Sequence, residues 1–140
     1  MGHCDLKPGD VIFYERFAGV DIIKDRYFIV ISNDGSLVNC FTTTTQPHAE
    51  KSPRLAAEFC ELAAGECCLP KRCFVDLRTV HEFWDTELSS RLRSKSVKQI
   101  GYLPAQILKK LHDALLKCRS LSQDEKEPLL LALAAEIGET

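Results

Sequence analysis

The stretch "RYFIVISNDGSLVNCFTTTT", from Arg26 to Thr45, constrains the fold of this chain more than any other. It begins with a continuous apolar run that has the length and the β-branched composition of a buried strand. The turn-forming residues "NDGS" follow, and an Asp-Gly pair between two such runs is the strongest short-range signal for a β-hairpin. We therefore predict two antiparallel strands, the second ending before Pro47, because proline cannot donate a hydrogen bond to a sheet.

Further short strands are predicted on both sides of this hairpin. The segment "GDVIFYERF" (9–17) is rich in aromatic and β-branched residues, and residues 18–25 form a loop before the hairpin. After a polar, irregular segment at 48–58, "EFCEL" and "CCLPKRCFVDLRTVHEF" predict more strands, interrupted by Gly65 and Pro70. Several short strands at this spacing indicate a small, strongly bent β-barrel.

The last third of the chain has a helical period. Apolar residues in "LPAQILKKLHDALLKCRS" recur every three to four positions, which predicts a helix over 104–120. A second helix is predicted over 122–138, because Ser122 and Glu125 have the spacing of a capping box. Its uninterrupted apolar run (129–135) indicates a helix that is either buried in its own chain or covered by a partner.

Length and composition narrow the class of protein. With 140 residues and neither an internal repeat nor a linker, we expect a single domain (1–140), mainly β with C-terminal helices. The barrel would cover 8–103. The N-terminus lacks a basic-then-apolar signal and no apolar run has the length of a bilayer span, so we expect a cytoplasmic protein without membrane contact.

The seven cysteines do not form an obvious disulfide framework, because their number is odd and two of them are adjacent. A zinc site lacks the C-x-x-C pairs and the spacing that zinc sites have. We interpret the thiols as small buried residues, and a nucleophilic Cys–His pair stays open because it requires proximity in space. The candidate zinc ligands would be Cys60, Cys67, Cys68 and Cys73 with His48 or His81.

Basic residues are concentrated in one part of a chain whose net charge is −2. No acidic residue lies between Glu87 and Asp113. Such a basic island is a candidate surface for phosphate groups, although a solvated loop and helix face would have the same composition. Its basic residues are Arg91, Arg93, Lys95, Lys98, Lys109 and Lys110.

The predicted hairpin also brings distant residues together. Because its strands are antiparallel, the segment from Thr43 to Gln46 should lie beside Arg26. A guanidinium can stabilise the charge of a phosphorane and a threonine hydroxyl can orient the phosphate, while the 2′-OH of RNA supplies the nucleophile without a metal. The alternative is an arginine–carboxylate pair at the rim, beside threonines that merely favour a strand.

In their order, "PGDVIF", "RYFIVIS", "CFTTTTQ", "VDLRT" and "GYLPAQILKKLHDAL" resemble the MazF/PemK toxins of type II toxin–antitoxin modules over residues 8–117. Each motif is short, so the resemblance rests on their order and spacing. It implies an SH3-like barrel that acts as a homodimer and is bound by an antitoxin protein. It also implies cleavage of single-stranded RNA without a metal or cofactor, leaving a 2′,3′-cyclic phosphate and a 5′-OH.

The resemblance implies roles for individual residues. Arg26 matches the family's catalytic arginine, and Thr44 matches its catalytic threonine, with a slippage of one residue left open. Asp76 matches an aspartate that some members use as a base. The expected RNA contacts are Lys24, Thr45, Gln46, Arg78, Arg91, Arg93, Lys95 and Lys98.

The chain also departs from the family's pattern. Tyr27 stands where the family has proline, Gly19 alone remains of a longer loop pattern, and Phe74 occupies the place of an arginine that some members use in cleavage. We expect 82–98 to be an inserted or remodelled loop, and 122–140 extends past the usual end. Two hypotheses follow: a metal-independent endoribonuclease of a toxin–antitoxin module, or a non-catalytic barrel that binds a protein or nucleic acid.

Overall fold

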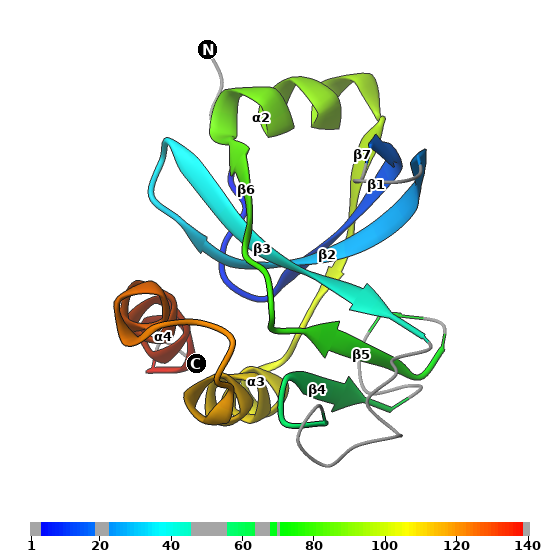
Figure 1. Cartoon of the computed structure of the whole chain (residues 1–140). Coiled ribbons are helices and arrows are strands. Elements are labelled where there is room, and N and C mark those ends of the chain that lie inside the picture. Colours follow the sequence, from blue (N-terminus) through cyan, green and yellow to red (C-terminus); the bar gives the residue numbers. More distant parts are fainter. Residues whose placement is uncertain (1–3, 19–22, 46–55, 64–67, 70, 139–140) are drawn as a thin grey trace.

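A computed structural model of the chain describes residues 4–18, 23–45, 56–63, 68–69 and 71–138, with residues 23 and 24 described by their backbone (Figure 1). The strands within these ranges are β1 (Asp10–Ala18), β2 (Ile23–Asn33), β3 (Leu37–Thr44), β4 (Phe59–Leu62), β5 (Cys73–Asp76), β6 (His81–Trp84) and β7 (Val97–Tyr102). The helices are α2 (Asp85–Ser94), α3 (Ala105–Lys117) and α4 (Gln123–Gly138).

The strands form an antiparallel sheet in the spatial order β4–β5–β3–β2–β1–β7, and β6 pairs with β3 beside β5. The predicted hairpin is present: Asp34 Oδ1 accepts hydrogen bonds from the backbone N–H groups of Ser36 and Leu37, and Gly35 has a φ of 92°. Within the described strands, β4 and β7 at the two ends of the sheet do not pair. The mainly β prediction is therefore confirmed, whereas the expected closure into a barrel is not found.

Both faces of the central strands are covered, which explains why the apolar run of β2 is continuous. Ile29 and Ile31 point into a core that includes α3 and α4, while Phe28 and Val30 point into a second core that includes α2. Figure 1 shows α2 on one side of the sheet and α3 and α4 on the other. The side of the sheet that carries α2 is called the α2 face below.

The segment 82–98 is not a loop, contrary to our expectation. It contains the end of β6, the helix α2 and the start of β7. Leu88 anchors α2 in the core, and the buried Asp85 carboxylate accepts hydrogen bonds from the backbone N–H and the thiol of Cys4 at 3.1 and 3.2 Å. The sequence signal was weak because α2 has two apolar residues, Leu88 and Leu92, and its N-cap, Trp84, makes no side-chain cap hydrogen bond.

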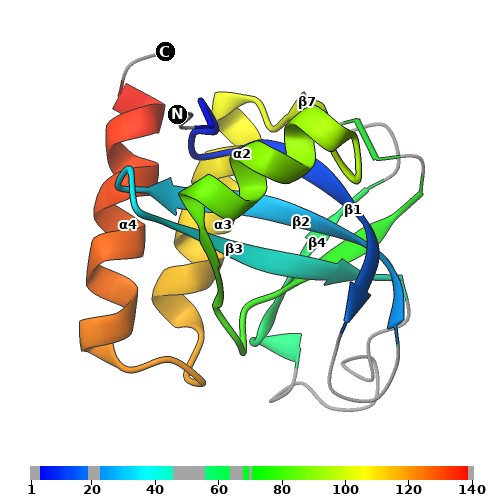
Figure 2. The ribbon, with the colours of Figure 1, turned by 90° about the horizontal axis from the view of Figure 1, so that it is seen from above.

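The two C-terminal helices lie side by side on the other face of the sheet (Figure 2). The capping box of α4 is present: Ser122 N–H donates to Glu125 Oε1 at 2.9 Å, and Glu125 N–H donates to Ser122 Oγ at 3.2 Å. The predicted apolar face of α3 is buried except for the half-buried Ala114. That face consists of Ile107, Leu108, Leu111, Ala114, Leu115 and Cys118.

The apolar run of α4 is covered by its own chain. Leu129, Leu130 and Leu133 are buried in the core, whereas Leu131 is 65% exposed. The run was expected to be buried in its own chain or covered by a partner, and burial in its own chain accounts for three of its leucines. In the described part of the chain, no helix combines the length and the apolar character needed to cross a membrane.

Gly101 of β7 lies against Cys68 in the connection between β4 and β5. A Cβ atom at position 101 would come within 2.5 Å of Cys68 Cβ and 2.7 Å of its Sγ. Because a Cβ atom is fixed to its backbone, one of the two segments would have to move. We expect Gly101→Ala to lower the free energy of unfolding by about 1–3 kcal/mol, measured by urea denaturation.

Gly138→Ala is the matched control for this prediction. A Cβ atom at position 138 would meet no atom within 4 Å, so we expect a change of less than about 0.5 kcal/mol. Equal effects of the two substitutions would contradict the close packing at Gly101.

Candidate functional site

The ladder between β2 and β3 ends at the pair of Phe28 and Thr42, two residues short of Arg26 and Thr44. On the other edge of β3, Thr43 and Thr44 pair with Val75 and Phe74 of β5. Arg26 itself pairs with Tyr14 of β1. The hairpin therefore directs the end of β3 toward Arg26, and a direct approach of Thr44 to Arg26 stays a prediction.

Alternation along β3 separates the threonines. Thr42 and Thr44 lie on the α2 face with Arg26, whereas Thr43 points to the opposite face. Thr45 is exposed and follows the last residue of β3. Thr42 and Thr44 are therefore the threonines of this run that share a face with Arg26, and the hydroxyl of Thr42 donates a hydrogen bond to the backbone carbonyl of Tyr27 at 3.3 Å.

Arg26 is half-buried at the start of a strand whose centre is buried. In the described ranges, no acidic side chain lies within ion-pair distance of its guanidinium, whereas Arg72, Arg78 and Arg91 each pair with an acid. The alternative of an arginine–carboxylate pair at the rim is therefore not found among these residues.

His81 joins Arg26 on the α2 face. It pairs with Cys40 in the ladder between β6 and β3, and its imidazole centroid lies 5.2 Å from the ring of Phe28 and 6.0 Å from that of Phe17. Burial lowers the pKa of His81 below its usual 6.5, the positive charge of Arg26 lowers it further, and Asp76 opposes both effects. His81 is consequently neutral at pH 7, beside a cation.

We had considered His81 only as a candidate zinc ligand. Its position near Arg26 depends on how β5 and β6 follow each other along β3. β5 pairs with Thr43 and Thr44, the chain passes Phe41 and Thr42 without pairing, and β6 pairs with β3 again from Cys40. Two short strands thus share one edge of β3, and the second begins with His81. No motif in the sequence signals this break.

Asp76 is engaged by Arg78. Its Oδ1 accepts hydrogen bonds from the backbone N–H and Nε of Arg78, each at 3.0 Å, and its Oδ2 accepts one from Nη2 at 2.9 Å. The guanidinium of Arg78 lies 4.9 Å from the ring centroid of Phe59. To act as a base, Asp76 would have to release Arg78, and to contact a phosphate, Arg78 would have to release Asp76.

The basic island does not form a single surface. Arg91 of α2 lies 5.0 Å from the ring centroid of Tyr14, on the α2 face, and pairs with Glu87 at 3.2 Å. Tyr14 is the strand neighbour of Arg26, so Arg91 lies toward the candidate site. Arg93 is exposed and donates to Ser89 Oγ at 3.3 Å.

Lys95 and Lys98 of the island point elsewhere, and Lys109 and Lys110 lie on α3. Lys98 follows the buried Val97 on β7, so its side chain leaves from the face opposite α2, where it pairs with Glu15 at 3.4 Å. Lys95 is the exposed, left-handed C-cap of α2, with a φ of 67°. A shared role in binding one RNA strand is thus easier to argue for Arg91 than for Lys98.

The cysteines behave mostly as small buried residues. Cys40, directly opposite His81, is 0% exposed, and burial raises the pKa of its thiol, so it stays protonated and does not form a nucleophilic pair with His81. Cys68 is exposed, whereas Cys4, Cys40, Cys60, Cys73 and Cys118 are buried. In the described ranges, no three His, Cys, Asp or Glu side chains are grouped so that they could hold a metal ion.

Several expectations fall on residues outside the described part of the chain. They concern Gln46, Pro47, His48, Cys67, the side chain of Lys24 and most of the loop and polar segments predicted at 18–25 and 48–58.

No protein-family model matches the chain, and no match was found among curated proteins. The site is therefore interpreted from its own geometry: a half-buried arginine, a threonine hydroxyl and a neutral histidine on one face of neighbouring strands.

Proposed function

We propose that the protein is an endoribonuclease that cleaves single-stranded RNA without a metal ion, using Arg26, Thr44 and His81. The observation that supports the proposal is the position of His81, opposite Cys40 and 5.2 Å from the ring of Phe28, on the face of the sheet that carries Arg26. Burial and the charge of Arg26 both lower the pKa of His81, which favours its neutral form. A general base is most effective when its pKa lies near the working pH and its unprotonated form predominates. An adjacent guanidinium supplies the charge stabilisation that phosphoryl chemistry requires.

In this proposal His81 accepts the proton of the 2′-OH while the 2′-oxygen forms a bond to phosphorus. The bond from phosphorus to the 5′-oxygen then breaks, and the 5′-oxygen takes up a proton from water, leaving a 2′,3′-cyclic phosphate and a 5′-OH. His81 afterwards releases its proton to solvent. Arg26 would hold the non-bridging oxygens as their charge develops, and Thr44 would donate a hydrogen bond to one of them. We give the role of base to His81 rather than Asp76, because the Asp76 carboxylate already accepts three hydrogen bonds from Arg78.

The resemblance to MazF/PemK toxins extends this proposal to partners and fold. We propose a toxin that works as a cytoplasmic homodimer and is neutralised by an antitoxin protein. Its curved sheet would be an open variant of the SH3-like barrel, for which the consecutive antiparallel strands β1, β2 and β3 are support. A neighbouring reading frame for a small acidic protein would favour this assignment.

The test is digestion of a mixed RNA in EDTA, followed by mapping of the new ends. We expect cuts that carry 5′-OH and 2′,3′-cyclic phosphate ends, and no cuts in an RNA with 2′-O-methyl groups, which lacks the nucleophile. RNA that stays intact at high protein concentration would contradict the proposal. RNA that is bound but not cut would instead support the non-catalytic binding module, which the ion pair of Asp76 and Arg78 favours.

A further inference from the structure

We propose that the groove between α3 and β4 binds phosphate groups of the RNA strand next to the cleaved position. The inference rests on the proposed function for its ligand. It joins two lysines of the basic island, Lys109 and Lys110, with Lys117 and β4 in one groove, a surface that the toxin resemblance did not include.

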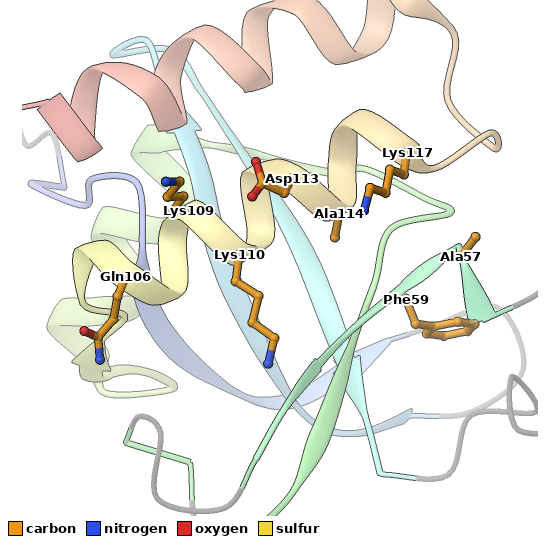
Figure 3. A pocket seen from close by; sticks show the side chains of 8 residues that line it. All are labelled: Ala57, Phe59, Gln106, Lys109, Lys110, Asp113, Ala114 and Lys117. Atoms are coloured by element: carbon orange, nitrogen blue, oxygen red, sulfur yellow. The ribbon is translucent and has the colours of Figure 1, made fainter.

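The groove has a volume of about 490 Å³ and is open to solvent on one side. Figure 3 shows Lys110 and Lys117 extending from α3 toward β4, with Phe59 and Ala57 on the opposite wall. Lys109 also lines the groove, and all three lysines are exposed. Between Lys109 and Lys117 the helix rises about 12 Å, so the positive charges are distributed along the groove rather than gathered at one point.

The charge of the groove favours a polyanion. Three lysines and Asp113 line it, which leaves a charge of +2 on a chain whose net charge is −2. Asp113 Oδ1 lies 3.8 Å from Nδ1 of its neighbour His112, which offsets part of the acidic charge when that histidine is protonated. An anionic ligand should therefore be concentrated at this part of the surface.

The groove is connected to the candidate site through Phe59. This side chain lines the groove and also lies under the guanidinium of Arg78, which holds Asp76. Asp76 is in turn close enough to His81 to act on its pKa. One strand of RNA could thus lie in the groove and reach His81 across Arg78.

A single-stranded nucleic acid fits these features better than an acidic peptide. Proteins that bind single strands combine basic side chains that follow the backbone with an aromatic side chain in the same groove. Lys109, Lys110 and Lys117 supply the first element, and these lysines carry the argument, because Phe59 lines the groove but is only 9% exposed.

The experiment measures binding of a fluorescent single-stranded 2′-O-methyl oligonucleotide, which cannot be cleaved through its 2′-oxygen, as a function of salt. We expect the double variant K109Q/K117Q to bind about tenfold more weakly at low salt. The slope of log K against log[salt] should fall in magnitude by about 1.4, because each phosphate contact on a single strand contributes about 0.7. The control K7Q/K71Q removes the same charge before β1 and before β5, at two exposed lysines outside the lining of the groove, and should leave the slope unchanged.

An unchanged slope in K109Q/K117Q, or an equal loss in K7Q/K71Q, would overturn the inference. A protein that binds a poly-glutamate peptide but not the oligonucleotide would also overturn it, in favour of an acidic protein partner. Binding and cleavage are separated by this design. If binding depends on the groove lysines but no RNA is cut, the groove is a binding site and the ribonuclease proposal fails. If RNA is cut but binding does not depend on these lysines, the ribonuclease proposal stands and the groove inference fails.

Discussion

Replacing Arg26 with alanine should lower kcat/KM for single-stranded RNA by about 100- to 1,000-fold, which is the usual effect of removing one group that stabilises a transition-state charge. Arg26 is half-buried and, in the described ranges, has no acidic partner, so its removal should change the free energy of unfolding by less than about 1 kcal/mol. The rate is measured with a labelled oligonucleotide in EDTA, and the stability by urea denaturation.

Arg119→Ala is the matched control, because the side chain of Arg119 is exposed and its hydrogen bond to Glu58 is donated by the backbone N–H. We expect its rate to stay near that of the wild type. If Arg26→Ala cleaves as fast as the wild type, or if the control loses the same activity, the assignment of Arg26 fails.

The same substitution has a consequence that needs no RNA. The charge of Arg26 helps to lower the pKa of His81, so Arg26→Ala should raise the pKa of His81 toward 6.5, observed by NMR titration of the imidazole protons. Any residual cleavage should then reach its plateau at a higher pH than in the wild type. An unchanged pKa would show that the two side chains do not interact.

Replacing Glu58 with alanine should lower the free energy of unfolding by about 2–3 kcal/mol, since the buried donors that surround it would lose a charged acceptor. Glu58 is 7% exposed and lies just before β4. Its carboxylate accepts hydrogen bonds from the backbone N–H of Arg119 at 2.9 Å, the backbone N–H of Ser120 at 2.7 Å and the Ser120 hydroxyl. It thus ties β4 to the connection between α3 and α4, and urea denaturation at pH 7 measures the loss.

The pH dependence identifies the charged carboxylate as the stabilising form. Desolvation raises the pKa of Glu58, but the hydrogen bonds from Ser120 and Arg119 outweigh it and hold the pKa below 4.5. A lowered folded-state pKa means that the contribution is complete above about pH 4.5 and is lost as the pH falls through the folded-state value. The difference in stability between wild type and Glu58→Gln should therefore be constant from pH 7 to about pH 5 and shrink below pH 4.5.

Glu82→Gln is the control for this pH dependence, because Glu82 is exposed on β6. It should show little difference from the wild type at any of these pH values. A Glu58→Gln variant whose deficit persists undiminished at pH 3 would indicate that lost packing, rather than lost charge, is responsible.

Much of the fold follows from local patterns. The hairpin of β2 and β3 was predicted from an apolar run and an Asp-Gly turn, and the capping box of α4 from Ser122 and Glu125. The helix α2 was missed because its two leucines and its uncapped N-terminus carry little helical signal; burial of Leu88 and Asp85 in the second core stabilises it instead. Closure of the barrel was expected from strand spacing, which says nothing about whether β4 and β7 pair.

The candidate site divides in the same way. The sequence by itself predicted that the end of β3 returns toward Arg26, because the two strands of a hairpin are antiparallel. The tertiary structure alone decided that the ladder between these strands ends at Phe28 and Thr42, that His81 lies close to Arg26, that Arg78 occupies Asp76, and that Glu58 holds the α3–α4 connection. The physical reason is that periodicity and turn chemistry act over a few residues, whereas burial and ion pairing depend on which distant segments pack together.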